Sequence, residues 1–329
     1  MKNFDLVQAN QPADAIKLVG TSPASRFIAG GTNLVDLMKY GIESPDTLVD
    51  ISRLPLDTVA KTATGLRIGA LARNSDVAAN KLITDQFPLL AQALLAGASP
   101  QLRNMATMGG NLMQRTRCYY FYDTSTPCNK RNPTPNAGPS GCGAIGGFNR
   151  IHAILGTSSS CIATNPSDMN VALSALNAVV QIQGPNGNRS VPLIDFHRLP
   201  GNTPQRDNVL EPNELIVAID LPTPRMAGKS HYQKVRDRAS YAFALVSVAV
   251  RLSVDNGMIR DVQLALGGVA HKPWRMPEVE KQAVGQPATE ATFRAIAGQL
   301  LAGAKPQNDN GFKIKLAENT IVRSLQTVM

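Results

Sequence analysis

The alternation of apolar and polar positions in the first 112 residues predicts short strands and helices in turn. Residues 1–57 hold a helical pattern after Gln11, a short strand in RFIAG, a helix in NLVDLMKY and a strand in TLVDIS, which is a βαβ-like order. Residues 58–112 continue with the alternating strand GLRIGALA, a helix in VAANKLI capped by Asn74-Ser75-Asp76, and a helix in PLLAQALLAG. This region is expected to end in a Gly-Gly turn.

Regular patterning returns after residue 165. A helix is expected after Ser167-Asp168, followed by a strand in VVQIQG and a hairpin turn at PNGN. Two long alternating runs meet at Asn256-Gly257, a strong hairpin signal, and helices are expected at 288–303 and 313–327. The Pro-containing stretch 222–230 is the best candidate for a linker. We therefore expect an α+β protein with units at 1–57, 58–224 and 230–329.

Between these regions, residues 113–165 form an irregular segment that holds every cysteine of the chain. The segment is rich in Gly, Pro, Asn and Ser, which favour turns. Clustered cysteines in such a loop indicate a metal or cluster site, disulfide bonds or a redox relay. Successive cysteines are separated by nine, thirteen and eighteen residues with no CxxC pair, so spacing alone signals neither zinc nor a ferredoxin-type motif. The cysteines are Cys118, Cys128, Cys142 and Cys161.

The composition argues against several classes of function. The 329 residues carry a net charge of +9, with 43% hydrophobic and 17% charged residues, which suits a globular protein with a large core. The chain has no run of Lys and Arg and no nucleic-acid-binding motif, so we expect no nucleic-acid partner. The longest apolar run, 241–250, is too short to cross a bilayer, so no membrane insertion is expected. The first residues contain neither an apolar signal-peptide core nor a twin arginine, so the chain is not expected to direct its own export.

Two Gly-Gly turns indicate where an anion would bind. One lies in Ile28–Leu34, between an expected strand and an expected helix, and the other in Thr107–Asn111. Glycines let the backbone approach a phosphate closely, and free N–H groups at such turns attract it. The spacing matches neither GxGxxG nor a P-loop, and one isolated Gly-Gly is usually an ordinary turn. Two such turns, each followed by Asn, are suited to hold the two phosphates of one pyrophosphate.

Three motifs in order, FIAGGTNLVDLMK, TMGGNL and NPSDMNVALSALNA, resemble the FAD-binding medium subunit of the xanthine dehydrogenase and molybdenum hydroxylase family. The resemblance continues through ELIVAIDLP and YQKVRDRASYAFALVSVAV and so covers essentially the whole chain. It implies a two-part FAD-binding domain of the vanillyl-alcohol-oxidase/PCMH type over 1–57 and 58–224. A smaller α+β domain, like the C-terminal domain of CO dehydrogenase flavoproteins, would follow at 230–329.

The resemblance also implies which residues bind FAD. Ser167-Asp168 would face the flavin, with Asp168 accepting hydrogen bonds from ribityl hydroxyls while it also caps a helix. Ile216 matches an apolar position near the isoalloxazine ring. Lys234 matches a basic position that would stabilise reduced flavin, with Gln233 as the alternative residue and an ordinary strand-edge lysine as the alternative role. The two Gly-Gly loops would hold the pyrophosphate through Ile28, Ala29, Gly30, Gly31, Thr32, Asn33, Leu34, Thr107, Gly109, Gly110 and Asn111.

By the same resemblance, the cysteine segment is an insertion at the edge of the flavin site. Asn111 and Ser167 are separated by 55 residues, far more than in most members of the family. RCYYFYD, PCNKR and GCGAIGG resemble the insertion in the flavin subunit of periplasmic aldehyde oxidoreductases, which implies a [4Fe–4S] cluster on all four cysteines. Five basic residues against one acid in 115–150 would offset the charge of the cluster and tend to raise its reduction potential. His152 is a spare candidate ligand that we interpret as structural.

The resemblance implies an electron-transfer subunit. A large partner would carry a molybdenum cofactor and oxidise an aldehyde to a carboxylic acid, and a small partner would carry [2Fe–2S] clusters. Electrons would reach the FAD and then a small-molecule acceptor, for which a molecule other than NAD is favoured. Export to the periplasm with a signal-bearing partner is the expected location, with the cytoplasm as the alternative. Two alternative functions stay open: a subunit of a benzoyl-CoA-type reductase or xanthine dehydrogenase-like enzyme, and a disulfide-stapled binding protein without enzymatic activity.

Overall fold

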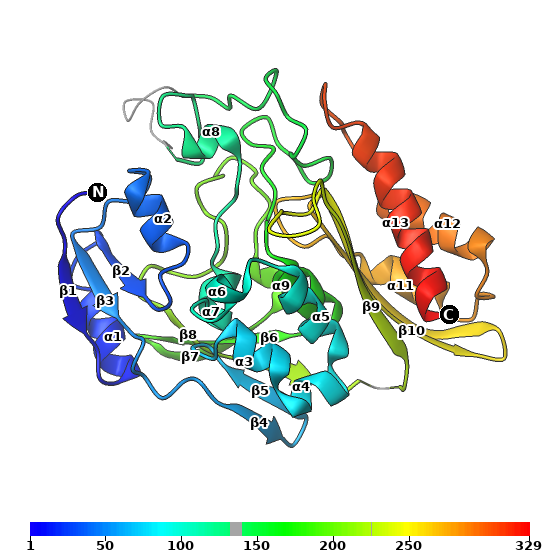
Figure 1. The fold of residues 1–329 in the computed structure, drawn as a ribbon, viewed down its shortest axis with the longest axis horizontal. Helices are drawn as coiled ribbons and strands as arrows, with labels where there is room; N and C mark the ends of the chain where they lie inside the picture. The colour runs from blue at the N-terminus through cyan, green and yellow to red at the C-terminus, as the bar shows by residue number, and fades with distance from the viewer. Residues whose placement is uncertain (132–139, 225) are drawn as a thin grey trace.

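The first unit of the computed structural model, which describes residues 1–131, 140–224 and 226–329, is a small parallel sheet (Figure 1). Its strand order is β1-β3-β2, with Val49 of the central strand paired to both neighbours and completely buried. Pro at its N-terminus and a buried stripe of Ala15, Ile16 and Val19 hold α1 in place. The elements are β1 (Asp5–Gln8), α1 (Pro12–Val19), β2 (Ser25–Ile28), α2 (Leu34–Lys39) and β3 (Thr47–Asp50).

The second unit is built on a five-stranded antiparallel sheet in the order β4-β5-β8-β6-β7. Strand β8 joins the units, because Leu215 packs into the core of the first and Ile219 into the core of the second. The helices pack on this sheet around buried α9. The elements are β4 (Val59–Thr62), β5 (Gly65–Gly69), α3 (Asn74–Ala79), α4 (Lys81–Gln86), α5 (Pro88–Ala96), α6 (Pro100–Arg103), α7 (Met108–Leu112), α9 (Asp168–Ala175), β6 (Val179–Gly184), β7 (Gly187–Pro192), α10 (Leu193–Phe196) and β8 (Leu215–Pro222).

The C-terminal unit is a three-stranded antiparallel sheet, β11-β10-β9, covered on one side by α11, α12 and α13 (Figure 1). Helices α5 and α9 of the second unit also contact this sheet. Burial on both faces explains the nearly continuous apolar run of β10, in which residues 246–252 are all buried. The elements are β9 (Lys229–Val235), β10 (Val246–Asp255), β11 (Met258–Gly267), α11 (Pro277–Ala283), α12 (Glu290–Leu300) and α13 (Phe312–Val328).

The cysteine segment lies above the helices of the second unit, between α2 and α13 (Figure 1). Its described part, 113–131 and 140–165, is irregular apart from the single turn α8 (Tyr119–Tyr122). Backbone bonds tie it to the C-terminal unit, since the N–H groups of Ile154 and Leu155 donate to the Val269 carbonyl at 2.9 and 3.0 Å. The buried Lys313 ammonium of α13 donates to the His152 carbonyl at 2.9 Å. The segment is therefore held on a fixed base.

The secondary structure that the sequence pattern predicted needs three corrections. The expected helix from Asn74 through Ile83 is two helices, because Asn80 ends α3 and its side chain accepts from Leu82 N–H to start α4. The second Gly-Gly turn is the first turn of helix α7, capped by the Thr107 side chain. Strands β1 and β4 and helix α11 were not expected, because their short patterns are weakly periodic. In the described residues, no helix has the length and apolar character needed to cross a membrane.

Candidate functional site

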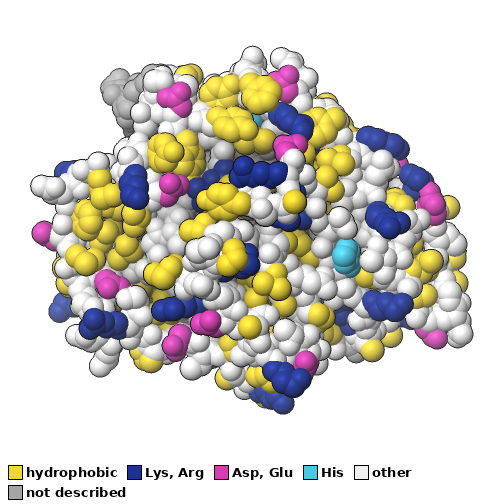
Figure 2. Space-filling view, viewed as in Figure 1, with side chains coloured by type: hydrophobic (Ala, Val, Ile, Leu, Met, Phe, Trp, Pro, Cys, Tyr) yellow, Lys and Arg dark blue, Asp and Glu magenta, His cyan; other side chains and the backbone are white. Residues whose placement is uncertain are grey.

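The largest cavity that we describe has a volume of about 760 Å³, within the usual range for cofactor sites. It opens between the first and second units, and the turn before α2 and the start of α7 form two of its walls. Arg26, Arg115 and Arg206 line it together with Glu43 and Asp207. Figure 2 shows Lys and Arg side chains gathered in the upper middle of this face, beneath a group of hydrophobic side chains.

The first wall is the turn that links β2 to α2. Gly31 has a φ of +69°, a conformation that suits glycine. A Cβ on Gly30 would lie 1.9 Å from the Met105 carbonyl oxygen, so glycine is required for this turn to meet the second wall. Among the described residues, the backbone N–H groups of 30–34 donate to no protein acceptor. The turn therefore offers backbone donors to an anion in the cavity.

The second wall contains Thr107, Gly109 and Gly110 at the start of α7. The Gly109 N–H donates to the Ala70 carbonyl at 2.7 Å, and a Cβ on Gly109 would sit 3.2 Å from that residue. Facing this wall, the Asn33 side chain accepts from the Arg115 backbone N–H at 2.9 Å, and its buried Nδ2 group has no partner. The polar part of the cavity thus fits a pyrophosphate, and apolar Leu71 and Ile216 suit the flavin ring.

The cavity brings together eleven of the fifteen residues that the sequence assigned to FAD. They are Ile28, Ala29, Gly30, Gly31, Thr32, Asn33, Leu34, Thr107, Gly109, Gly110 and Ile216. Asn111, Ser167, Asp168 and Lys234 do not line it. Asn111 supports the wall from behind, because its Oδ1 accepts a hydrogen bond from the Ser167 hydroxyl at 2.8 Å. Ser167 also caps α9 by accepting from the Asn170 N–H.

Asp168 and Lys234, which the sequence assigned to the flavin site, form a buried ion pair. The Lys234 ammonium lies 2.7 Å from one Asp168 carboxylate oxygen, and both side chains are about 5% exposed. The other oxygen accepts from the Tyr232 hydroxyl at 2.6 Å, and Lys234 also donates to the Ala96 carbonyl. A buried charge needs a partner of opposite sign, and here the Asp168 carboxylate and the Lys234 ammonium are each other's partner. This pair joins β9 of the C-terminal unit to α5 and α9 of the second unit.

Replacing Lys234 with methionine is therefore expected to lower the free energy of unfolding by about 3 kcal/mol, because the buried Asp168 carboxylate loses its main partner. Urea unfolding followed by circular dichroism measures this loss. The double variant Lys234→Met with Asp168→Asn removes both charges and is expected to recover part of the stability. FAD content should stay stoichiometric in both folded variants, and flavin loss without destabilisation would favour a direct flavin role instead.

Arg115 is the main cavity residue that the sequence analysis missed. Its guanidinium donates to Asp207 at 3.0 Å and to Glu43 at 2.7 Å, and it lies 4.8 Å from the centre of the Phe121 ring. From the sequence, Arg115 was considered only as one of the basic residues of the cysteine segment. Its position directly after the second Gly-Gly motif was the available signal. Asp207 and Glu43 had no such signal, since they come from distant loops.

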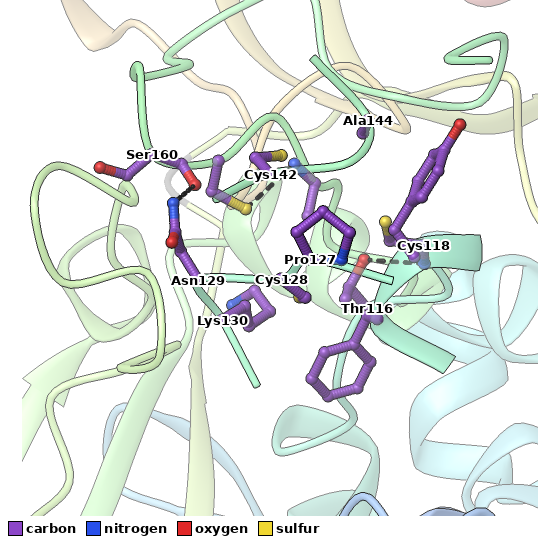
Figure 3. Close-up of a pocket in the computed structure, with 13 residues that line it drawn as sticks. Thr116, Cys118, Pro127, Cys128, Asn129, Lys130, Cys142, Ala144 and Ser160 are labelled. Carbon is purple, nitrogen blue, oxygen red and sulfur yellow. Dashed lines mark hydrogen bonds between the residues drawn. The ribbon is translucent and has the colours of Figure 1, made fainter. Parts of the chain in front are cut away.

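All four cysteines line a second, small cavity, which contains about 10 Å³ of free space. Figure 3 shows Cys118, Cys128 and Cys142 arranged around it together with Lys130. All four are free thiols, so the disulfide-stapled alternative does not fit the structure. Backbone bonds between Asn129 and Gly141 and between Pro127 and Gly143 bring Cys128 and Cys142 opposite each other. The sequence spacing alone could not show this convergence.

The donor set around this cavity fits an iron–sulfur cluster, although a cluster is not shown. Across residues 1–131, 140–224 and 226–329, no group of three His, Cys, Asp or Glu side chains is arranged to hold one metal ion. In a cluster each thiolate binds its own iron, so the sulfur atoms surround a larger body than a single ion. Burial raises the pKa of Cys118 to about 12 and of Cys161 to about 11, so binding iron would have to displace their protons.

His152 contacts the first of these cysteines and has no acid beside it. Its Nε2 atom lies 3.0 Å from the Cys118 sulfur, and its buried Nδ1 atom has no partner. Burial lowers the pKa of His152 to about 4, so the ring is neutral at physiological pH. The structural interpretation of His152 agrees with its position between the cysteine cavity and the carbonyl-binding Lys313.

Comparison with known proteins places this geometry in a family. Residues 2–224 match the model for the FAD binding domain in molybdopterin dehydrogenase, and residues 230–328 match the CO dehydrogenase flavoprotein C-terminal domain. The chain is 51% identical over 327 residues to the aldehyde oxidoreductase FAD-binding subunit PaoB of Escherichia coli K12, covering 99% of this chain and 98% of that protein. It is 30% identical to the glyceraldehyde dehydrogenase medium chain of Sulfolobus acidocaldarius, covering 93% and 90% of the two chains.

The fold comparison agrees with this assignment. A structure of reconstituted CO dehydrogenase from Oligotropha carboxidovorans superposes with a TM-score of 0.78 over 99% of this chain and 98% of that chain, at 22% identity. The expected α+β architecture of a FAD-binding domain followed by a smaller C-terminal domain is confirmed. The expected FAD is supported by the matching domain. The chain belongs to the family of FAD-binding medium subunits of the molybdenum hydroxylases, which are oxidoreductases.

Proposed function

We propose that this chain is the electron-transfer subunit of a molybdenum-dependent aldehyde oxidoreductase and carries both FAD and a [4Fe–4S] cluster. The observation that carries the proposal is the 51% identity, over almost the full length of both chains, to an aldehyde oxidoreductase FAD-binding subunit. The second relative, a glyceraldehyde dehydrogenase medium chain, is also named for an aldehyde substrate. A large partner with a molybdenum cofactor and a small partner with [2Fe–2S] clusters complete the proposed complex.

The proposed cluster site rests on the chemistry around the small cavity. Four unpaired thiols face one space, and three of them are buried. Thiols of this kind bind iron–sulfur clusters as thiolates. A buried ammonium, Lys130, lines the same cavity and is placed to offset the negative charge of four thiolates. Cys118, Cys128, Cys142 and Cys161 would be the ligands.

In the flavin cavity, the residues of the chain bind and orient the cofactor. Backbone N–H groups in 30–34 are placed to hold the pyrophosphate. Apolar side chains such as Leu71 and Ile216 would pack against the isoalloxazine ring, which supplies the redox chemistry when bound. The cavity opens to solvent, so a small electron acceptor can approach.

Aldehyde-dependent dye reduction by the purified complex tests the proposed reaction. Reduction of a dye with an aromatic or aliphatic aldehyde, and not with xanthine, is expected. Dye reduction with xanthine alone would favour the xanthine dehydrogenase-like alternative, and oxidation of a reduced dye when a benzoyl thioester is added would favour the reductase. Iron and flavin analysis of the same preparation tests the cofactors separately. A complex that oxidises aldehydes but holds no iron beyond that of the small partner's [2Fe–2S] clusters would refute the [4Fe–4S] cluster and leave the proposed function standing.

A further inference from the structure

One half-buried carboxylate, Asp207, lies between the flavin cavity and the cysteine cavity. Asp207 lines the flavin cavity, and its Oδ2 atom accepts from the Arg115 guanidinium at 3.0 Å. Its Oδ1 atom pairs with the Lys130 ammonium, which lines the cysteine cavity. Arg115 in turn pairs with Glu43 at 2.7 Å. A line of alternating charges, Lys130–Asp207–Arg115–Glu43, therefore connects the two sites.

Lys130 is held firmly at the cysteine end of this line. Its side chain is 1% exposed, and its ammonium also donates to the Pro204 carbonyl at 2.6 Å. His271 is the other basic group near Asp207, with Nε2 at 3.7 Å, and burial lowers its pKa to about 4, which leaves it neutral. Burial alone would raise the pKa of Asp207, but Lys130 and Arg115 outweigh that effect and lower it to about 2. Asp207 therefore faces Lys130 and Arg115 as a carboxylate at physiological pH.

The positions of the two charges decide their effect on the cysteine cavity. Lys130 lines that cavity, whereas Asp207 lies behind it and divides its charge between Lys130 and Arg115. The nearer cation dominates the potential at the cysteines, because electrostatic interaction falls with distance and is poorly screened inside a protein. An electron added in this cavity is stabilised by that cation. Removing the cation makes reduction less favourable.

We propose that Lys130 sets the reduction potential of the cluster in the cysteine cavity, and that Asp207 and Arg115 position it from the flavin side. Lys130 acts on the cluster through its positive charge and binds no iron itself. The assignment rests on the proposed [4Fe–4S] cluster. It makes the flavin wall part of the support of the cluster site, because the residue that holds Lys130 also lines the flavin cavity.

An EPR-monitored redox titration of the purified complex, with dithionite as reductant, tests this role. Lys130→Met is expected to keep its iron and FAD and to need at least about tenfold stronger reducing conditions for half-reduction of the cluster, which corresponds to about 59 mV for a one-electron couple. Lys130→Arg keeps the charge and should restore most of the wild-type potential. Lys81→Met, at an exposed lysine paired with Asp85, is the matched control and should leave the potential unchanged.

Asp207→Asn provides a second test if Lys130→Met does not retain iron. It removes the opposing charge, while the Pro204 carbonyl and the asparagine amide oxygen can still accept from Lys130, so the cluster potential should rise. An iron-replete Lys130→Met complex with the wild-type potential, or an Asp207→Asn complex with an unchanged or lower potential, would overturn the role of Lys130 and leave the cluster proposal standing. A wild-type complex with no iron beyond that of the small partner's [2Fe–2S] clusters would instead overturn the cluster proposal and this inference with it.

Discussion

Replacing Gly30 with alanine is expected to reduce the FAD content of the purified chain by at least about tenfold, because the two walls of the flavin cavity can no longer meet. The added Cβ would lie 1.9 Å from the Met105 carbonyl oxygen and 2.7 Å from its carbonyl carbon. Both atoms belong to the backbone, so no flexible side chain can move aside. The turn in 28–34 must then shift away from Thr107 and open the site that we assign to the pyrophosphate.

Flavin absorbance per mole of protein, together with a thermal melt, measures this effect. Gly298→Ala is the matched control, since its Cβ meets nothing within 4 Å and alanine is favoured over glycine by about 1 kcal/mol inside a helix such as α12. The control should keep its FAD and melt at the same or a higher temperature. If Gly30→Ala also retains stoichiometric flavin, the contact between these walls does not shape the FAD site.

The flavin loops could be predicted from the sequence because their signals are local. Glycine is needed where backbones touch or φ is positive, and both conditions occur within a few residues, at Gly30 and Gly31. A motif of that kind keeps its meaning wherever the rest of the chain lies. The placement of 28–34 and 107–110 around one cavity follows from the motifs and their order.

The roles of Asp168 and Lys234 could not be predicted in the same way. An Asp at the start of a helix is equally suited to a ligand and to a buried partner. Only the pairing of β9 with β10, and its packing on α5 and α9, shows that Lys234 meets this Asp. Asp207 is a similar case, because its partners Arg115 and Lys130 are more than seventy residues away. Long-range ion pairs leave no periodic trace in a sequence.

The cysteines lie between these two cases. Their loop has no regular period, and their spacing matches no standard motif, so the sequence left disulfides, metal and cluster open. The fold narrows the possible roles of the cysteines, because all four thiols are unpaired and line one cavity. This convergence depends on backbone bonds such as Asn129 N–H to Gly141 O, at 2.7 Å, within the loop itself.

Replacing Cys128 with serine is expected to remove the iron of the proposed [4Fe–4S] cluster and to leave the FAD and the iron of the small partner in place. A serine hydroxyl is a far weaker iron ligand than a thiolate, and three cysteines cannot saturate a four-ligand cluster. The neighbouring backbone bonds, Asn129 N–H to Gly141 O and Gly143 N–H to Pro127 O, do not use the sulfur, so the loop keeps its frame. The two glycine-containing walls of the flavin cavity, in 28–34 and 107–110, come from other segments, which separates the two cofactor losses.

Iron analysis of the purified complex, with absorbance near 400 nm and flavin content from the same sample, measures the outcome. Ser160→Ala is the matched control, because Ser160 lines the same cavity and its contact with Asn129 is made by its backbone carbonyl. It should keep its iron. Full iron in Cys128→Ser would show that this sulfur is no ligand. Loss of iron together with all of the FAD would show that the insertion and the flavin site fold as one unit, which the separate anchors of the two cavities argue against.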